Sequence, residues 1–371
     1  MVINTALLEI AVQLSSLSVG LAHAGRVAEA IAPMEQACGA ALTAFSGLPA
    51  SFRFVARDQL PGIADDEHFL ARIARQGLTF LAPLAAVSRG GSHLRRFSAV
   101  GCLCGVAARE MAGDKVVQCI FDVGDGSDAG DYHRFAFCAA GANSTLIPDP
   151  YFFETDGYEE LRRTVEAEAA PWEVRRDVVF WRGAASGKPD RWPDAGEPMD
   201  WGCLQRLKLC EESRRIAEPS RVDVGLSDLG QIVREDIKER IRAAGFLGEH
   251  VDKREFLGFR YLVDIDGNTN SWGLLEKMIM GATIVKVASR RGYRQWFYDR
   301  LVAWENFVPV AADLSDMEET VAWLFANPGE AKRIAVNGAA LAGELQFSRV
   351  LAETEAAFFI ALMRHGVIVE N

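Results

Sequence analysis

The part of the chain best suited to chemistry is the segment 264–281, which reads Asp-Ile-Asp-Gly-Asn-Thr-Asn-Ser-Trp-Gly-Leu-Leu-Glu-Lys-Met-Ile-Met-Gly. Gly267, Asn268 and Asn270 tolerate the backbone angles of a tight loop. Ser271 favours the N-cap of a helix, and apolar residues follow it at helical spacing. Free backbone N–H groups at the start of a helix face whatever lies in front of them, so this junction predicts an anion site.

A second candidate for anion binding is the segment 178–187, Val-Val-Phe-Trp-Arg-Gly-Ala-Ala-Ser-Gly. It reads as a buried strand that ends in Arg-Gly and small residues. Arg182 would lie at the carboxyl end of this strand, where ligands bind in open α/β sheets. The small residues from Gly183 to Ser186 would let a bulky anion approach the backbone. Together the two turns predict a site for a large anion.

A third candidate is an acidic segment, 122–131, which could supply either a general base or ligands for Ca²⁺. Four aspartates lie among its glycines, namely Asp122, Asp125, Asp128 and Asp131. The EF-hand loop has a different spacing and ends in a glutamate, so that match fails. An acidic loop that donates one base is therefore favoured over a bound cation. For the nearby His133, a histidine satisfied within its loop is favoured over one that touches an acceptor.

Two series of strands and helices would position these residues. In the first series, strand-like runs cover residues 78–81, 98–106, 116–123 and 135–139. In the second series, they cover residues 177–183, 221–224, 256–265, 281–287 and 304–310. Short apolar strands that alternate with helices predict an α/β protein, here with two domains and a cleft between them.

The predicted domain organisation has four parts. Residues 1–47 form a helical extension, a helix pair that faintly resembles one tetratricopeptide unit; no second copy follows, so packing on the next domain is favoured. Residues 48–170 form an N-terminal α/β domain, and residues 171–345 form a second one. Residues 346–371 contain a final helix that could pack back on the N-terminal domain.

Composition excludes several classes of function. The chain has 371 residues, of which 49% are hydrophobic, and its formal net charge of -11 leaves no basic surplus for nucleic acid or an anionic membrane. We read no apolar run as long enough to span a bilayer and no signal peptide. The seven cysteines form no CxxC pair, and Cys102-x-Cys104 is read as strand core rather than as a metal site. We therefore expect a cytoplasmic protein without a transmembrane segment.

Several motifs taken together resemble glycosyltransferase family 90, which includes the protein O-glucosyltransferases and the fungal capsule xylosyltransferases. The resemblance spans residues 115–345. The motifs are Phe180-Trp181-Arg182-Gly183, Asp266-Gly267-Asn268 with Ser271-Trp272, the strand Gly281–Val287, the stretch Trp304–Pro309, and Asp313–Asp316 at the start of a helix.

The resemblance implies a GT-B-like architecture, in which two Rossmann-like domains face a cleft and the C-terminal one binds a UDP-sugar. It implies transfer of glucose, xylose or a similar sugar with inversion at the anomeric carbon and without a metal ion or other cofactor. The N-terminal domain would then hold the acceptor. Its aspartate beyond a strand, Asp125, would be the base that takes the proton of the acceptor hydroxyl, with Asp122 and Asp128 as rivals.

The resemblance also implies the residues that bind the donor. Arg182 would contact the diphosphate, and Asp223 would lie near the uracil and ribose. Asp266 is read as structural or ribose-contacting rather than as part of a D-x-D metal motif, and Trp272 as a pocket wall or as plain core. The full donor set is Arg182, Gly183, Ser186, Asp223, Asp266, Gly267, Asn268, Ser271, Trp272, Glu276 and Lys277.

One position departs from the animal members of the family. An arginine that follows the Ser-aromatic pair there is replaced by Gly273 in this chain. Glu276-Lys277 loosely resembles the Glu-Lys pair of plant members. Lys277 could supply the missing charge, or arginines of the next loop could do so, namely Arg290, Arg291 and Arg294.

The sequence therefore favours a metal-independent, inverting glycosyltransferase of bacterial type. The acceptor would be a hydroxyl of a lipopolysaccharide, capsule or other glycan, or of a protein. One alternative is a non-catalytic protein of the same fold that binds a sugar nucleotide or a glycan. The other is an adaptor whose N-terminal helices recruit a partner.

Overall fold

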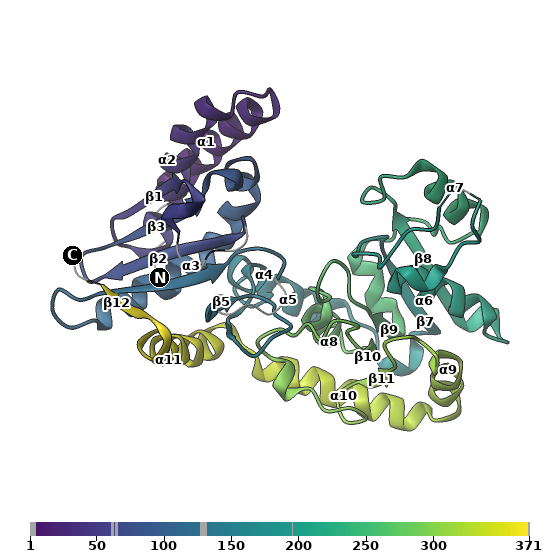
Figure 1. The fold of residues 1–371 in the computed structure, drawn as a ribbon. Helices are drawn as coiled ribbons and strands as arrows, with labels where there is room; N and C mark the ends of the chain where they lie inside the picture. Colours follow the sequence, from purple (N-terminus) through teal and green to yellow (C-terminus); the bar gives the residue numbers. More distant parts are fainter. Residues whose placement is uncertain (1–4, 61–62, 64–65, 127–131, 195, 370–371) are drawn as a thin grey trace. The chain divides into compact units, whose positions relative to one another are not determined.

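A computed structural model describes residues 5–60, 63, 66–126, 132–194 and 196–369. The chain divides into two compact units, whose elements are labelled in Figure 1. Unit 1 comprises Met1–Gly157, Arg294–Trp296 and Phe347–Asn371. Unit 2 comprises Tyr158–Tyr293 and Phe297–Gln346.

Unit 1 is built on a seven-stranded mixed sheet. The neighbours β1–β3, β4–β5 and β5–β6 are parallel, whereas β2 is antiparallel to both β3 and β4, and β12 is antiparallel to β4. The strand directions in this sheet are therefore mixed, unlike those in the parallel sheet of a Rossmann-like domain. Its strands are β1 (Ala50–Val55), β2 (His68–Ala74), β3 (Gly77–Pro83), β4 (Val116–Asp122), β5 (Arg134–Ala136), β6 (Ser144–Leu146) and β12 (Val367–Val369).

Helices and a phenylalanine core cover this sheet. The rings of Phe121 and Phe135 pack against Phe358 with centroid distances of 5.9 and 4.5 Å, which places the C-terminal helix on the sheet of unit 1. The helices of the unit are α1 (Thr5–His23), α2 (Val27–Ser46), α3 (Gly90–Glu110), α4 (Pro150–Glu154) and α11 (Phe347–His365), with 3-10 helices at Arg57–Gln59 and Leu84–Arg89.

The strand predicted at residues 98–106 is wrong, because these residues lie inside helix α3. Helix α3 contacts α1, α2, α11 and strands of the sheet. The run therefore needs apolar or small residues on every side. A helix buried all round loses the periodicity that would distinguish it from a buried strand. Cys102 and Cys104 are buried core residues, as expected, but of a helix.

Unit 2 contains a five-stranded sheet that is parallel throughout, in the order β11-β10-β9-β7-β8. Its strands are β7 (Arg176–Ala184), β8 (Val222–Asp228), β9 (Phe259–Asp264), β10 (Thr283–Val287) and β11 (Val308–Val310). The α-helices are α5 (Glu159–Glu168), α6 (Gln205–Arg215), α7 (Glu235–Ala243), α8 (Leu274–Ile279), α9 (Met317–Ala326) and α10 (Pro328–Glu344). The 3-10 helices are Trp172–Val174, Trp201–Cys203, Pro219–Arg221, Lys253–Gly258 and Tyr298–Arg300.

The strand order of unit 2 contains a topological switch point. The chain passes from β7 to β8 on one side of β7 and then returns to place β9 on the other side. In open α/β sheets, ligands bind outside the carboxyl ends of the strands at such a point. The α/β class expected from the sequence is confirmed, and the segments that follow β7 and β9 are the two predicted anion turns.

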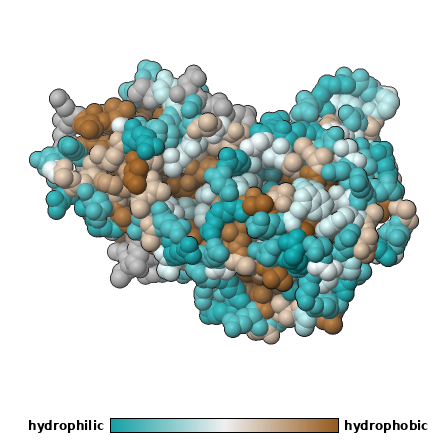
Figure 2. All heavy atoms as spheres, turned by 90° about the horizontal axis from the view of Figure 1, so that it is seen from below, coloured by the Kyte–Doolittle hydropathy of each residue, from teal (hydrophilic) through white to brown (hydrophobic). Residues whose placement is uncertain are grey.

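Helix α1 leaves several large apolar side chains exposed, including Ile10, Val12 and Leu17. By length and composition alone, its residues Ala6–His23 could cross a membrane, and 17% of them are buried. This corrects the expectation that no apolar run reaches the required length. Core helices of soluble proteins and signal sequences share these properties. On the face shown in Figure 2, hydrophobic residues form separate patches among hydrophilic ones.

Candidate functional site

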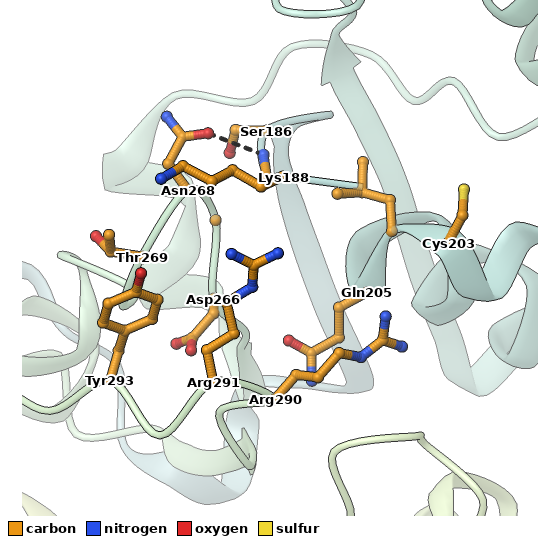
Figure 3. A pocket seen from close by; sticks show the side chains of 13 residues that line it. Ser186, Lys188, Cys203, Gln205, Asp266, Asn268, Thr269, Arg290, Arg291 and Tyr293 are labelled. Carbon is orange, nitrogen blue, oxygen red and sulfur yellow. Dashed lines mark hydrogen bonds between the residues drawn. The ribbon is translucent and has the colours of Figure 1, made fainter. Parts of the chain in front are cut away.

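A pocket in unit 2 lies at the switch point, beside the carboxyl ends of β7 and β9 (Figure 3). Four segments line it: the loop after β7, the start of α6, the loop after β9 and the loop after β10. Three of its lining residues are cationic, and one is a buried carboxylic acid. The lining residues are Ser186, Gly187, Lys188, Cys203, Leu204, Gln205, Asp266, Gly267, Asn268, Thr269, Arg290, Arg291 and Tyr293.

The loops after β7 and β9 are held against each other. The side-chain oxygen of Asn268 accepts a hydrogen bond of 3.0 Å from the backbone N–H of Gly187. A Cβ atom at Gly267 would lie 2.7 Å from the hydroxyl oxygen of Ser186 and 2.8 Å from Nη2 of Arg206, so a larger residue there would have to displace one of these side chains. Of the predicted donor residues, Ser186, Asp266, Gly267 and Asn268 line the pocket.

Arg206 fixes both loops from behind. Its guanidinium donates to the backbone carbonyl oxygens of Asp266 at 2.8 Å, of Ala184 at 2.9 Å and of Ile265 at 3.3 Å. Charged donors make the stronger hydrogen bonds to carbonyl groups. Arg206 therefore sets the positions from which the loops present their side chains.

Beneath the loop after β9 lies a buried charge network around Asp264, which is fully buried. Its carboxylate accepts hydrogen bonds from Ser271 Oγ at 2.5 Å, Lys277 Nζ at 2.8 Å and Lys286 Nζ at 3.0 Å. Burial by itself would raise the pKa of Asp264, but the two ammonium groups and the hydroxyl hold that pKa below its ordinary value. Asp264 in turn holds both lysines, although its single negative charge offsets only one of their two positive charges.

Asp266 occupies a different environment from Asp264. It is 8% exposed and lines the pocket, and its Oδ1 atom has no hydrogen-bond partner within the described residues. Burial raises the pKa of its carboxyl group to about 6, against the opposing effect of Lys286. The two aspartates of the D-x-D sequence thus differ in role: one balances lysines, and the other faces the pocket. The residues that the structure describes contain no group of three or more His, Cys, Asp or Glu side chains placed to hold a metal ion.

The structure gives Arg182 protein partners in place of the expected ligand. Its Nη2 lies 2.5 Å from Asp223 Oδ1, and its other nitrogens donate to the backbone oxygens of Asp223, Trp181 and Glu249. The half-buried Gly183 follows it in β7. The described residues that line the pocket do not include Arg182, Gly183 or Asp223. Contact of Arg182 with a diphosphate stays a prediction.

The predicted helix start at Ser271 is wrong. Helix α8 begins at Leu274, its N-cap is Gly273, and it has six residues. Ser271 Oγ donates a hydrogen bond to the buried carboxylate of Asp264, and the residue at the N-cap, Gly273, has no side chain that could cap the helix. The remaining predicted residues of this segment are likewise outside the pocket lining: Trp272 is half-buried, Glu276 accepts hydrogen bonds from Lys253, and Lys277 binds Asp264.

In unit 1, the candidate base Asp125 has a side chain that is 43% exposed, and its Oδ1 accepts a hydrogen bond of 2.6 Å from Arg96. Its rival Asp122 is buried; its Oδ1 accepts from the backbone N–H of Gly124, and its Oδ2 lies 3.7 Å from His68 Nε2. Exposure thus favours Asp125 over Asp122. Asp128 and Asp131, named from the sequence, lie outside the described residues.

The other residues weighed from the sequence in unit 1 have protein partners. His133 stacks on His365 with a centroid distance of 3.9 Å, and its Nε2 lies 3.0 Å from Thr145 Oγ1. Burial lowers the pKa of His133 to about 4. Arg294 belongs to unit 1 and pairs through its backbone with Ala139, so it does not join the other arginines of its loop at the pocket.

Sequence reasoning missed several residues of the site, among them Lys188 and Gln205, which line the pocket, and Arg206, which supports its loops. A signal existed for Lys188, because it directly follows the small residues of the first anion turn. Gln205 and Arg206 open helix α6, and nothing in the local sequence distinguishes them from solvent-facing helix residues. Gln205 donates to the backbone oxygens of Ala288 and Ala312, which lie far along the chain.

Comparison with known families gives one match that covers both pocket loops. The model of the family described as Glycosyl transferase family 90 matches residues 155–352. Protein O-glucosyltransferase 2 from Danio rerio is 24% identical over 211 residues, which cover 55% of this chain and 37% of that protein. Protein O-glucosyltransferase 3 from Homo sapiens is 28% identical over 141 residues, which cover 38% of this chain and 26% of that protein. The chain thus spans well under half the length of these relatives.

Among solved structures, HepE from Anabaena in complex with UDP and glucose gives a TM-score of 0.38 at 12% identity, covering 74% of this chain and 81% of that chain. A glycosyltransferase from Rickettsia africae gives a TM-score of 0.36 at 11% identity, covering 63% of this chain and 64% of that chain. The family model, by contrast, matches more than half of the residues, including those of the pocket. This chain belongs to glycosyltransferase family 90.

Proposed function

We propose that the chain transfers a sugar from a UDP-sugar to a hydroxyl group and that the pocket of unit 2 holds the donor. The observation that carries this proposal is the position of the pocket. It lies at the switch point of a parallel sheet, inside the segment that matches the family, and presents Lys188, Arg290 and Arg291 together with Asp266. Cations suit a diphosphate, and a carboxyl group suits a hydroxyl of the ligand.

The proposed chemistry needs positive charge at the leaving group. When the bond between the sugar and UDP breaks, negative charge develops on the diphosphate, and fixed cations in the pocket would stabilise it. We propose that cations of the loops after β7 and β10 do this without a metal ion. These cations lie on two loops, and each loop follows a strand of the same sheet. This supports the role, because the positive charges are then in place before the reaction begins.

We further propose that the reaction inverts the anomeric carbon and that Asp125 is its general base. The attack of an acceptor hydroxyl on the anomeric carbon requires a group that takes the hydroxyl proton. The exposure of the Asp125 carboxylate supports the choice, and Arg96, at 2.6 Å, would hold it in one orientation. The sugar is glucose, xylose or a similar one, and the acceptor is a hydroxyl of a surface glycan or of a protein.

Asp125→Asn tests the proposed reaction. The wild-type chain would be incubated in EDTA with UDP-glucose or UDP-xylose and a panel of glycan and protein acceptors, and UDP release would be measured. Loss of a general base should lower the rate about 10²–10⁴-fold, because asparagine keeps the shape of the side chain but accepts no proton. Asp114→Asn, which also neutralises an aspartate of unit 1, should leave the rate unchanged. Equal rates for Asp125→Asn and wild type would contradict this role of Asp125.

A non-catalytic sugar-nucleotide or glycan-binding protein is the second candidate. The presence of Gly273 in place of the arginine of animal members favours it, and so does the contact of Lys277 with buried Asp264 instead of with the pocket. Saturable binding of a UDP-sugar without turnover on any acceptor would support it. Turnover that Asp125→Asn abolishes would exclude it.

A further inference from the structure

Several cations lie in or close to the pocket region of unit 2, and most of them already have strong protein partners. Lys277 and Lys286 share the buried carboxylate of Asp264 at 2.8 and 3.0 Å. Arg182 is paired with Asp223 at 2.5 Å. A cation whose charge is balanced by a nearby carboxylate attracts a ligand phosphate less. None of these three residues lines the pocket, and each is held by a protein carboxylate, so they are poor candidates for its anion-binding side.

Arg206 is held by backbone carbonyl groups instead of by a carboxylate. It donates to three backbone carbonyl groups, of Ala184, Ile265 and Asp266, and so acts as a fixed support of the two loops. Moving its guanidinium to a ligand would break all three hydrogen bonds. Its contribution to binding is thus the placement of other groups.

Three cations remain, and all of them line the pocket: Lys188, Arg290 and Arg291. Arg290 donates to the backbone oxygen of Gly202 at 2.8 Å and lies 3.4 Å from Asp190, so it is largely satisfied. Arg291 approaches Asp190 only to 3.9 Å, which is beyond a hydrogen bond. Within the residues described here, Lys188 has no ion pair.

Figure 3 shows how these side chains are arranged. Lys188 extends along the loop that carries Asn268, and Arg291 rises from the loop after β10 toward the same region. Arg290 points to the side of Gln205 and Cys203. Lys188 and Arg291 line the same pocket from two different loops. Two positive charges match the two negative charges that the diphosphate of a sugar nucleotide carries at neutral pH.

Asp266 provides an independent sign of a ligand at this place. It is more than nine-tenths buried and faces the pocket, yet its Oδ1 atom has no hydrogen-bond partner within the described residues. An unpaired buried acceptor is costly unless a ligand or water satisfies it. A hydroxyl group of a bound sugar nucleotide would donate to it.

We propose, on the basis of the function proposed above, that Lys188 and Arg291 bind the diphosphate group of the sugar nucleotide, while Asp266 accepts a hydrogen bond from a hydroxyl group of the same ligand. Arg290 positions the loop through its bond to Gly202. Neither Lys277 nor Arg182 supplies the charge. The donor site of this chain is thus specific for a nucleoside diphosphate that carries hydroxyl groups.

The test is a calorimetric titration of the full chain with UDP-glucose at two salt concentrations. Arg291→Ala and Lys188→Ala should each raise Kd about 10-fold, the low end for a charged hydrogen bond, because about a third of the Arg291 side chain is exposed to solvent. Each should also reduce the loss of affinity between low and high salt. Arg291→Lys should restore part of the affinity, since it keeps the charge.

Arg300→Ala is the matched control. Its side chain is 35% exposed, compared with 36% for Arg291, and it also approaches one carboxylate, that of Glu344, but it does not line the pocket. We expect its Kd to equal that of the wild type. Equal thermal midpoints of all variants would show that the folded state is unchanged, and Arg291→Lys keeps the test informative if Arg291→Ala unfolds.

The outcomes separate this inference from the proposed function. If the wild type binds UDP-glucose and both alanine variants bind it within twofold of wild type, the assignment of Lys188 and Arg291 is overturned while the proposed function stands. If Lys277→Met abolishes binding in a folded protein and Arg291→Ala does not, Lys277 is the diphosphate ligand instead. If the folded wild type binds neither UDP-glucose, UDP-xylose nor UDP itself, the proposed function fails, and the assignment of these residues fails with it.

Discussion

At the scale of single residues, the burial of Asp266 lowers the stability of the fold but places a carboxyl group where a ligand could bind. Its side chain is buried at the pocket, and this burial raises the pKa of the carboxyl group to about 6 from an ordinary value of 3.8. Ionising it at neutral pH therefore costs free energy of folding. A site that keeps such a group gains a polar acceptor for a ligand, at the expense of stability.

Asp266→Asn should remove this cost. A native state that binds the proton more tightly than the unfolded chain gains stability that is fully present below pH 3.8 and is lost as pH rises through about 6. The free energy of unfolding of the variant, relative to wild type, should therefore increase between pH 4 and pH 7.5. The upper bound is about 3 kcal/mol, from about 1.4 kcal/mol per pKa unit.

Urea unfolding of both proteins at the two pH values measures this difference, and taking the difference cancels the groups that the two proteins share. A relative stability that stays constant or falls with rising pH would contradict a raised pKa at Asp266.

Part of the site could be predicted from the sequence. Ser186, Gly267 and Asn268 line the pocket as predicted. They could be predicted because the strand-to-loop junctions that carry them are recognisable in the sequence. The carboxylates that pair with Arg182 and Lys277 could not be predicted from the sequence. Asp223 reaches Arg182 from strand β8, and Asp264 neutralises Lys277 across the start of α8. Such pairs depend on strand order, which local residue patterns do not encode.

At the scale of elements, α2 and α3 pack against each other through glycines of α3. A Cβ atom at Gly105 of α3 would lie 2.4 Å from the backbone oxygen of Ser46, and one at Gly101 would lie 2.8 Å from Cβ of Phe45. The small residues therefore set the distance between the helices. This contact joins the N-terminal helices to the rest of unit 1.

Gly105→Ala should destabilise unit 1 by about 1–3 kcal/mol, because a backbone atom cannot move aside as a flexible side chain could. Gly20→Ala in α1 is the matched control: nothing lies within 4 Å of its added Cβ, so the higher helix propensity of alanine should stabilise the protein by about 0.5–1 kcal/mol. Thermal unfolding of both variants measures the two effects. Equal effects of the two substitutions would argue against tight packing of α2 on α3.

The elements of unit 2 were easier to predict than those of unit 1. Parallel strands buried on both faces read as short apolar runs between turn signals, and β7, β9 and β10 lie where such runs are found. Unit 1 mixes parallel and antiparallel neighbours and contains a helix, α3, whose residues 98–106 are almost all buried. Periodicity cannot separate such a helix from a strand, so residues 98–106 were assigned wrongly.

At the scale of the whole molecule, the chain places its proposed roles in different units. Unit 2 contains the pocket for the donor, and unit 1 contains Asp125, the proposed base. Unit 1 is completed by the C-terminal residues Phe347–Asn371, so both ends of the chain belong to it. Donor binding should therefore depend on residues of unit 2 and turnover on residues of both units.

The most direct test of the central claim is a calorimetric titration of the full chain in EDTA with UDP-glucose, compared with Gly267→Ala. The wild type should bind with one site and a micromolar Kd. The variant should bind at least about 10-fold more weakly, because its added Cβ would displace Ser186 Oγ or Arg206. A folded wild type that shows no saturable binding at millimolar UDP-glucose, or a Gly267→Ala variant that binds as the wild type does, would contradict a UDP-sugar site in this pocket.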